Sequence, residues 1–252
     1  MTNISDDAVS ACPKVTVVTV CRNVRDMLAR TIDSVSSQTY PDIEYVVVDG
    51  MSTDGTPEML YGCAGGIDKW ISEPDRGIYD AMNKGVGLAT GEWVIFMNAG
   101  DTFYAPDTVE RVFATHFDND VDVVYGDVAI PAVCGFPKIK IASEPRNCHR
   151  MFFCHQSAFA RRQALLSHPF DIERRYSADF KFFKTLLLGG SRFVHVGLPV
   201  ALYDMTGVSN RRRSEGLRDN IRVVSETDSA VDRLRFLPRL WFNWAMCRLR
   251  GK

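Results

Sequence analysis

The chain has 252 residues, of which 46% are hydrophobic and 24% charged, and its formal net charge is −1. This composition is typical of a globular protein and excludes disordered and fibrous classes, and no apolar run approaches the ~20 residues of a membrane-spanning helix. The N-terminus lacks a basic segment followed by an apolar one, so we expect a cytoplasmic protein. Seven cysteines without a Cys-x-x-Cys pair favour reduced thiols over a disulfide framework or a thiolate zinc site.

Strand and helix signals alternate over the first half of the chain. A β-branched run at 14–20 predicts a buried strand, and a helix is expected to follow with Asn23 as its N-cap. A second strand at 42–49 ends in Asp49 and a turn-rich segment. Further strands are expected near 69–72, 93–97 and 121–126, with helices after residues 56, 78 and 105. This order predicts an α/β fold with a mostly parallel, Rossmann-like sheet and helices on both faces.

The C-terminal region is basic, whereas the remainder is acidic. Residues 205–252 hold 11 Lys and Arg against 5 Asp and Glu, a net charge of +6 that leaves −7 on residues 1–204. Residues 233–252 combine six basic residues with Trp241, Trp244 and other apolar side chains. This pattern predicts either an interfacial helix on an anionic membrane or a terminal helix packed on the domain. Pro238 interrupts the ideal helical pattern.

Polar motifs follow the predicted strands at four places. They are Thr19-Val20-Cys21-Arg22-Asn23, the segment from Val47 to Gly55, the segment from Glu73 to Lys84, and Asn98-Ala99-Gly100-Asp101. In this order and spacing they resemble family 2 glycosyltransferases, which have the GT-A fold. The Glu-Pro-Asp-Arg-Gly-Ile-Tyr-Asp-Ala-Met-Asn-Lys-Gly block resembles bacterial exopolysaccharide enzymes of the colanic-acid type. The resemblance extends from about residue 15 to about residue 209 and implies a GT-A fold, with a Rossmann-like mixed and mostly parallel sheet and a C-terminal helical extension.

The resemblance implies a donor site at the ends of the first strands. Thr19, Asn23 and Asp49 would hold the nucleoside of a nucleotide-sugar donor, and a carboxylate at a strand end can accept from a base N–H or a ribose hydroxyl. The alternative for Asp49 is an Asx turn. The resemblance also places Asp75 and Arg76 near the nucleotide or its diphosphate, against the alternative of a solvent-facing turn.

The segment Asn98 to Asp101 occupies the place of the family's Asp-x-Asp metal motif. Asn and Gly replace two carboxylates there, so only Asp101 remains as an acid. The resemblance implies Mn²⁺ or Mg²⁺ at Asp101, with Asn98 on ribose or sugar hydroxyls. Phosphate oxygens and water can complete the coordination of such an ion. A capped turn at Asp101 is the alternative interpretation.

The resemblance places the acceptor chemistry in the second half of the chain. Asp179, near a predicted helix start, is the expected general base, and a helix N-terminal acid stabilised by the dipole is the alternative. His155 is expected at the donor sugar or diphosphate. Ser209 and Arg211 belong to a loop expected to close over the diphosphate. Asp127 is a second, lower-ranked candidate for acceptor or sugar contacts.

We therefore expect one catalytic domain at 14–210, with a nucleotide-sugar half at 14–126 and an acceptor half at 127–210. A disordered leader at 1–13 would precede it, and a basic helical extension at 211–252 would follow. The expected activity is inverting transfer of a hexosyl or deoxyhexosyl group from a nucleotide sugar to a glycan hydroxyl. The acceptor would be a polyprenyl-diphosphate-linked precursor of a bacterial surface polysaccharide, reached from the cytoplasmic face of the membrane through residues 233–252.

Two functions other than glycosyl transfer stay open. A catalytically silent nucleotide-sugar-binding or scaffold protein is compatible with the reduced motif at 98–101. A nucleotidyltransferase would need a Gly-rich, basic loop after the first strand, and residues 19–23 contain no glycine. The basic tail is accompanied by no nucleic-acid-binding motif, so nucleic acid is not an expected partner.

Overall fold

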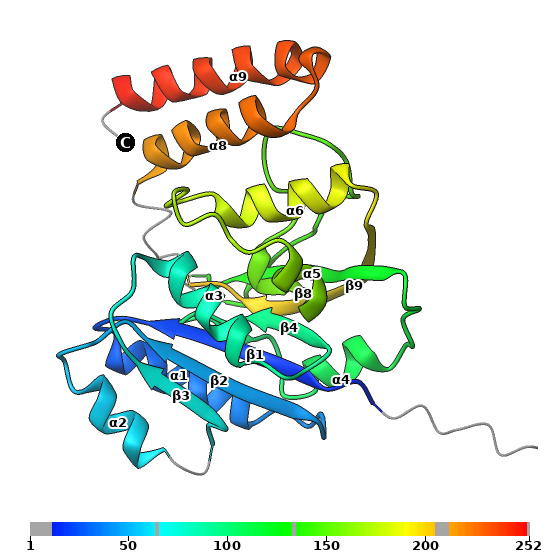
Figure 1. Cartoon of the computed structure of the whole chain (residues 1–252). Helices are drawn as coiled ribbons and strands as arrows, with labels where there is room; N and C mark the ends of the chain where they lie inside the picture. Colours follow the sequence, from blue (N-terminus) through cyan, green and yellow to red (C-terminus); the bar gives the residue numbers. More distant parts are fainter. Residues whose placement is uncertain (1–11, 64–65, 133–134, 205–211, 251–252) are drawn as a thin grey trace, which may run out of the picture.

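The computed structural model describes residues 12–63, 66–132, 135–204 and 212–250, and these residues form one nine-stranded sheet covered by helices (Figure 1). The strands are β1 (Val15–Cys21), β2 (Ile43–Asp49), β3 (Lys69–Ser72), β4 (Trp93–Phe96), β5 (Thr102–Phe103), β6 (Val121–Ile130), β7 (Lys138–Lys140), β8 (Ala158–Arg161) and β9 (Arg192–Leu202). Their order is β3-β2-β1-β4-β8-β6-β9-β5, and β7 pairs with β6.

Helices cover both faces of this sheet. They are α1 (Arg25–Ser36), α2 (Thr56–Gly62), α3 (Ile78–Leu88), α4 (Thr108–Phe113), α5 (Arg162–Ser167), α6 (Ala178–Leu188), α8 (Arg213–Thr227) and α9 (Ala230–Leu249), with a 3-10 turn, η1 (His155–Ser157). Buried side chains of α1, α2 and α4 pack into one core cluster, and those of α3, α5 and α6 pack into another. The expected α/β fold with helices on both faces is therefore confirmed.

The central strand β1 separates the two cores. Val15 and Val17 belong to one cluster and Val18 and Val20 to the other, because successive side chains of a strand alternate between the faces of the sheet. On α3, Gly85 lies against Val18 so closely that a Cβ at position 85 would overlap the Val18 side chain. The absence of a side chain at this position lets α3 lie directly on the strands whose ends carry the site.

The sheet changes direction beyond β4. The longest ladders, β1 with β2 and β6 with β9, are parallel. However, β8 enters between β4 and β6 and pairs antiparallel with both. The strand predicted near 121–126, observed as β6, is therefore not a direct neighbour of β4. Between them lies β8, which comes from the less regular part of the chain. The sheet is mixed, and its purely parallel part is β3-β2-β1-β4.

The C-terminal extension is helical, as predicted, and its two helices, α8 and α9, form a hairpin that packs on α6 (Figure 1). Phe180 of α6 and Phe236 and Leu240 of α9 share one buried cluster with residues of α8. A buried ion pair, Lys184 Nζ to Asp228 Oδ2 at 2.9 Å, ties α6 to the hairpin. Pro238 lies inside α9 without ending it. No helix in the described ranges has the length and hydropathy needed to cross a membrane.

Candidate functional site

The carboxyl ends of four parallel strands lie along one edge of the sheet. β1 pairs in parallel with β2 and β4, and β2 pairs in parallel with β3. The loops that leave these ends carry the four motifs identified in the sequence. In open α/β sheets, ligands bind in the crevice at the carboxyl ends of the strands. The fold thus brings the predicted donor residues to one edge.

The loops after β1 and β2 are tied together in a strained conformation. Asn23 and Met51 have φ angles of 53° and 61° and are the two non-glycine residues with positive φ in the described ranges. The Asn23 N–H donates to Ser52 Oγ at 2.7 Å, and the Thr53 N–H donates to Asn23 Oδ1 at 2.8 Å. Such strain concentrates at functional sites, where the surrounding structure holds it.

Asn23 does not have the capping role that the sequence predicts. Helix α1 begins at Arg25 with Val24 as its N-cap, and no side chain of the cap residue bonds to the helix. Instead, the Arg25 N–H donates to Oδ2 of Asp54, from the loop after β2, at 3.0 Å. The Asn23 amide is already used to fasten the two loops, so a side chain from the neighbouring loop caps the helix.

Thr19 and Asp49 lie beneath the surface of the site. Both are fully buried. The Asp49 carboxylate accepts from the Ser52 N–H at 3.0 Å, from the Ser72 hydroxyl at 2.6 Å and from the Ser52 hydroxyl. The Thr19 hydroxyl donates to the Met97 carbonyl at 2.7 Å. Direct contact with a nucleoside does not fit this burial; Asp49 instead forms the turn that was the alternative interpretation.

Asp75 and Arg76, which follow β3, have different surroundings. Asp75 Oδ1 accepts from the Gly77 N–H at 2.8 Å, and its side chain lies over Gly50, where a Cβ would overlap Asp75 Oδ2. The Arg76 side chain is 73% exposed and pairs with Asp80 one turn along, at 3.3 Å. Asp75 therefore belongs to the edge of the site, whereas Arg76 lies in the solvent-facing arrangement that the sequence left open.

Asp101 is a buried acid at the end of the loop after β4. Its Oδ1 accepts from the Asp204 N–H at 2.8 Å and its Oδ2 from Gln156 Nε2 at 3.2 Å. Burial, together with the nearby Asp204 carboxylate, raises the pKa of Asp101 to about 6 against the lowering effect of these hydrogen bonds and of His155. No Lys or Arg in the described ranges pairs with it. A partly uncompensated acid of this kind favours a bound cation.

Asp179 is an acid held by two hydrogen-bonding side chains. The Tyr79 hydroxyl donates to Oδ1 at 2.8 Å, and His155 Nδ1 lies 3.2 Å from Oδ2. Burial opposes the charge on this carboxylate, but the hydrogen bonds from His155 and Tyr79, together with the His155 charge, outweigh it and hold the pKa of Asp179 below its ordinary value. The side chain keeps 16% exposure, so a small group can reach it.

His155 lies between Asp179 and Asn98. Its Nδ1 faces the Asp179 carboxylate and carries a proton, and its Nε2 lies 3.4 Å from Asn98 Nδ2. The Asn98 Oδ1 atom is then left buried without a hydrogen-bond partner in the described ranges. A buried oxygen of this kind suits a ligand hydroxyl or a cation.

Helix α8 fixes the start of the helix that carries Asp179. The Tyr176 N–H donates to Asp219 Oδ2 at 3.0 Å, and the Ser177 hydroxyl donates to Asn220 Oδ1 at 2.6 Å. Ser177 is the N-cap of α6, and Asp179 lies in its first turn. The C-terminal hairpin therefore contributes to the site indirectly, because it holds the loop from which the acid is presented.

The site contains two acids with opposite pKa shifts, connected by the η1 turn. His155 contacts Asp179 and its neighbour Gln156 contacts Asp101. The pKa of one acid is lowered and that of the other is raised. Paired titratable groups whose pKa values are pushed apart are typical of acid–base and metal sites. Asp179 is held as a carboxylate, the form that a general base needs before it takes up a proton, whereas Asp101 is better suited to a metal.

The oxygen donors around Asp101 fit a hard divalent cation. In the described ranges, no group of three His, Cys, Asp or Glu residues is arranged to hold a metal. However, a Cβ placed at Gly100 would lie 2.8 Å from Asp204 Oδ2, so a second carboxylate adjoins this loop. Asn98 Oδ1 supplies a neutral oxygen. Mg²⁺ and Mn²⁺ accept such oxygen ligands and complete their coordination from phosphates and water.

The remaining predicted residues lie elsewhere. Asp127 Oδ1 accepts from the Ala142 N–H at 2.9 Å and lies 2.8 Å from His195 Nε2, so its carboxylate is engaged between β6 and β9. Ser209 and Arg211 lie outside the described residues, as does most of the leader expected at 1–13. No position relative to the site is therefore assigned to them.

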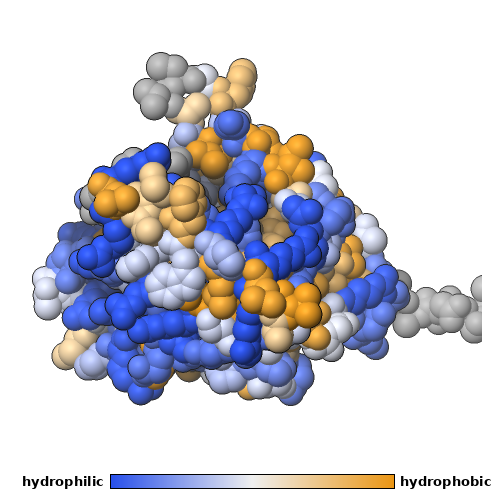
Figure 2. All heavy atoms as spheres, turned by 90° about the horizontal axis from the view of Figure 1, so that it is seen from above, coloured by the Kyte–Doolittle hydropathy of each residue, from blue (hydrophilic) through white to orange (hydrophobic). Residues whose placement is uncertain are grey.

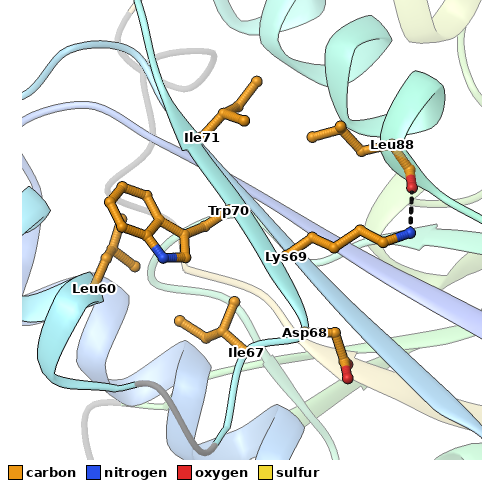
Figure 3. Close-up of a pocket in the computed structure, with 7 residues that line it drawn as sticks. All are labelled: Leu60, Ile67, Asp68, Lys69, Trp70, Ile71 and Leu88. Carbon is orange, nitrogen blue, oxygen red and sulfur yellow. Dashed lines mark hydrogen bonds between the residues drawn. The ribbon is translucent and has the colours of Figure 1, made fainter.

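A cavity of about 500 Å³ lies at the outer edge of the sheet, along β3 (Figure 3). Its lining residues are Leu60, Ile67, Asp68, Lys69, Trp70, Ile71 and Leu88. Its polar side chains already have partners: Lys69 bonds to Glu44 and the Leu88 carbonyl, and Asp68 accepts from the Tyr45 N–H. None of the residues discussed above lines it, so we place the chemistry at the strand ends instead.

Comparison with known proteins identifies the family. The model described as Glycosyl transferase family 2 matches residues 16–168, more than half of the chain. The chain belongs to glycosyl transferase family 2. Among curated relatives, the PGL/p-HBAD biosynthesis glycosyltransferase of Mycobacterium tuberculosis is 35% identical over 177 residues, 68% of this chain and 69% of the relative. The succinoglycan biosynthesis protein ExoO of Rhizobium meliloti is 33% identical over 106 residues, 42% of this chain and 30% of ExoO.

Solved structures agree on the fold of this family 2 member. TarS residues 1–349 of S. aureus, in complex with UDP, superimposes with a TM-score of 0.68 at 19% identity and covers 90% of this chain and 70% of its own. The mannosyltransferase PcManGT of Pyrobaculum calidifontis, in complex with GDP-Man and Mn²⁺, gives a TM-score of 0.69 at 20% identity, covering 93% and 70%. The resemblance to family 2 and the GT-A fold are thus confirmed.

Two residues of the site were not identified from the sequence. Tyr79 lies inside the block from Glu73 to Lys84, and only the fold shows that it reaches Asp179, 100 residues later. Asp204 closely follows the end of β9. An acid shortly after a strand is a signal that could have identified Asp204.

Proposed function

We propose that residues 14–210 form a catalytic domain that transfers a hexosyl or deoxyhexosyl group, with inversion, from a nucleoside diphosphate sugar to a glycan hydroxyl. The observation that carries this proposal is the pair of acids bridged by η1. Asp179 is a carboxylate held by Tyr79 and His155, and its pKa is lowered. Asp101 is a buried acid whose pKa is raised. An inverting displacement needs these two elements, a base on one side of the sugar and a stabilised leaving group on the other.

In this proposal Asp179 accepts the proton of the attacking hydroxyl. Tyr79 and His155 fix the carboxylate at 2.8 and 3.2 Å, which limits its movement and orients its remaining lone pairs. Asn98, which bonds to His155 and keeps a buried oxygen unpaired, is suited to hold a hydroxyl of the ribose or of the transferred sugar. His155 would therefore lie between the general base, Asp179, and the donor sugar held by Asn98.

The leaving diphosphate would lie at Asp101. Asp101, with Asp204 as a further oxygen donor, would hold Mn²⁺ or Mg²⁺. A bound cation would neutralise the charge that develops on the departing diphosphate. Ser209 and Arg211, which lie outside the described residues, are proposed to contact the same diphosphate.

The nucleoside would occupy the edge formed by the loops after β1, β2 and β3. Asn23 and Asp75 border this edge, while Arg76 would contribute to it only in a different side-chain arrangement. UDP in the TarS complex and GDP-Man with Mn²⁺ in the PcManGT complex support a nucleotide-sugar donor. The similarity to a succinoglycan biosynthesis protein supports a polysaccharide precursor as acceptor. We propose that this precursor is linked to polyprenyl diphosphate and lies on the cytoplasmic face of the membrane.

A thermal-shift screen of the purified chain tests the donor. UDP, GDP, dTDP and CMP, and their sugar conjugates, are added with and without Mn²⁺. A ligand at 100 times its Kd should stabilise the native state by about 2.7 kcal/mol. We expect a metal-dependent shift with one nucleoside diphosphate class. The absence of a shift with every nucleotide would contradict the proposed function.

The reduced motif at 98–101, which retains one acid, also fits an alternative function, that of a catalytically silent nucleotide-sugar-binding or scaffold protein. Donor consumption separates the two, because a transferase turns over its sugar nucleotide, by transfer to an acceptor or slowly to water. We expect slow release of the nucleoside diphosphate from the best-binding sugar conjugate, and a loss of that release in Asp179→Asn. Binding without any release, and without an effect of the variant, would favour the scaffold.

We also propose that α9 contacts the inner leaflet of an anionic membrane. Its inward face packs on α8 through Phe236 and Leu240, yet Trp241, Phe242 and Leu249 are 50%, 65% and 81% exposed. Figure 2 looks onto this end of the molecule, where apolar and strongly hydrophilic side chains intermingle. A helix with exposed aromatic residues next to arginines is suited to the interface of anionic lipids.

Vesicle binding tests this contact. The full chain is sedimented with vesicles of phosphatidylcholine alone or with one third phosphatidylglycerol. We expect binding only to the anionic vesicles, and its loss in the double variant Trp241→Ser with Phe242→Ser. Tyr61→Ser on α2 is the matched control, because Tyr61 is also exposed, at 74%, and helix α2 lies at the opposite end of the molecule from α9 (Figure 1). Equal binding of the double variant would contradict the proposal.

A further inference from the structure

The end of β2 carries a glycine whose missing side chain is replaced by a carboxylate from another loop. Asp75, in the loop after β3, lies over Gly50 so closely that a Cβ at position 50 would overlap Asp75 Oδ2. Asp75 Oδ1 accepts from the Gly77 N–H at 2.8 Å, which fixes the side chain. No hydrogen bond to Asp75 Oδ2 is found within the described ranges. One oxygen therefore anchors the carboxylate, and the other is available to a ligand.

The position of this oxygen points to the uncharged end of the donor. In the sheet order, β2 is separated from β4 by β1, so Gly50 lies about two strand spacings, roughly 10 Å, from the strand that leads to Asp101. A carboxylate without a cation repels a diphosphate, whereas the cation proposed at Asp101 would attract one, so the phosphates belong near Asp101 and the nucleobase belongs here. Met51, adjacent to Gly50, is 59% exposed in a left-handed conformation, and its apolar side chain offers a surface for a flat ring.

Asp49, the acid that the sequence favours for this role, is excluded by its surroundings. Its carboxylate is fully buried and accepts hydrogen bonds from Ser52 and Ser72. Asp49 thus has both carboxylate oxygens engaged, whereas Oδ2 of Asp75 is available to a ligand. We propose that Asp75 reads the nucleobase of the donor and selects bases that carry an imino N–H, namely uracil, thymine or guanine. This inference rests on the proposed function and specifies its donor class.

The selection follows from the chemistry of an ionised carboxylate, which accepts hydrogen bonds and donates none. Uracil and thymine present the N3–H, and guanine presents the N1–H beside its amino group. Cytosine and adenine present a ring nitrogen lone pair at the same edge, which faces the charged oxygen without a proton between them. A carboxylate oxygen that a bound base covers without offering it a proton loses its water and gains no partner, which costs more than a changed apolar contact, so such a contact discriminates between bases.

Calorimetric titration of the full chain with UDP, dTDP, GDP, CDP and ADP, each with Mg²⁺, tests the inference. We expect at least one of UDP, dTDP and GDP to bind at least tenfold more tightly than CDP and ADP. In Asp75→Asn this ratio should fall by at least tenfold, because an amide can also donate to a ring nitrogen. Glu73→Gln is the matched control, because it removes one charge two residues away from a side chain that pairs with Lys84. It should leave the ratio unchanged.

A second variant tests the same geometry without altering the carboxylate. Gly50→Ala should displace Asp75 and reduce the selectivity as Asp75→Asn does, since the added methyl occupies the place of Oδ2. Gly87→Ala, on α3 with open space around its Cβ position, is its control. Circular dichroism melting shows that each variant is folded. Tighter binding of CDP or ADP to the wild type, or an unchanged ratio in both Asp75→Asn and Gly50→Ala, would overturn this inference alone. Binding of no nucleotide would overturn the proposed function.

Discussion

The two halves of the site are built in different ways. The donor edge consists of consecutive strand–loop units, and its loops are joined by bonds such as Asn23 to Ser52 that span about 30 residues. The acceptor side is assembled from distant parts of the chain. Tyr79 donates to Asp179 across 100 residues, and the Asp204 N–H donates to Asp101 across 103. The first half follows from local sequence, whereas the second depends on the whole fold.

This difference has a consequence for function. The donor edge is held by contacts among its own strand–loop units, because α3 lies directly on β1 and buried residues such as Asp49 fasten its loops. Asp179 depends instead on η1, α3 and α8 together. Changes on the acceptor side should therefore alter turnover with little effect on nucleotide binding, and changes at the donor edge should do the reverse.

The largest expected effect is that of Asp179→Asn. An amide cannot take up the acceptor proton, so we expect kcat to fall about a thousandfold while the nucleotide Kd changes less than twofold. Donor consumption measured by chromatography gives kcat, and calorimetry gives Kd. Asp171→Asn is the control, because it also removes a carboxylate on this side of the molecule, one that pairs with Lys181 at 2.7 Å. A proportional loss of nucleotide binding in Asp179→Asn would show that the acceptor side also contributes to donor binding.

Asp101 should make cation binding sensitive to pH. The pKa of this acid is raised to about 6, chiefly by burial, and a divalent cation requires the carboxylate form. As pH falls through 6 the carboxylate gains a proton, so Mn²⁺ affinity should be about tenfold lower at pH 5 than at pH 7. Calorimetry with Mn²⁺ and a nucleoside diphosphate measures this. Asp101→Asn should bind Mn²⁺ weakly and with a flatter pH profile; an unchanged profile would exclude Asp101 as the ligand.

Tyr79→Phe should produce a smaller change with a distinctive signature. The phenol hydrogen bond stabilises the Asp179 carboxylate and lowers its pKa. Without it the pKa rises, and the acid limb of the pH–rate profile should move to higher pH by about one unit. Tyr45→Phe removes the contact of another buried phenol, with Thr19, and should not move this limb. An unshifted limb in Tyr79→Phe would mean that this contact only stabilises the fold.

The same contrast explains what the sequence could predict. Strands with β-branched runs and helices with regular apolar spacing were predicted close to their observed bounds, because these patterns are local. The insertion of β8 between β4 and β6 was missed, since pairing with a strand some 30 residues away leaves no local pattern. The role of Pro238 was also misjudged, because packing of α9 on α8 stabilises the helix despite the missing N–H.

For the site, residue type and position were predictable but exposure was not. Asp49 and Asp75 both follow strands and both carry carboxylates, yet one is fully buried beneath serines and the other lies over a glycine. Neither Ser72 nor Gly50 marks this distinction in the sequence by itself. The proximity of His155 to Asp179 likewise results from the packing of η1 against α6, which depends on the folded chain.

The smallest expected effect concerns Arg76, which the family resemblance places at the nucleotide. Its side chain is 73% exposed and pairs with Asp80, an exposed helix pair of a kind that contributes about 0.3–0.5 kcal/mol. Arg76→Ala should therefore change nucleotide affinity less than twofold in calorimetry. Asp75→Asn, one residue away, should alter base selectivity at least tenfold. If Arg76→Ala instead weakens every nucleotide diphosphate equally and more at low salt, its guanidinium must leave Asp80 to reach the diphosphate, and the donor edge would then rearrange on binding rather than accept the nucleotide as a preformed surface.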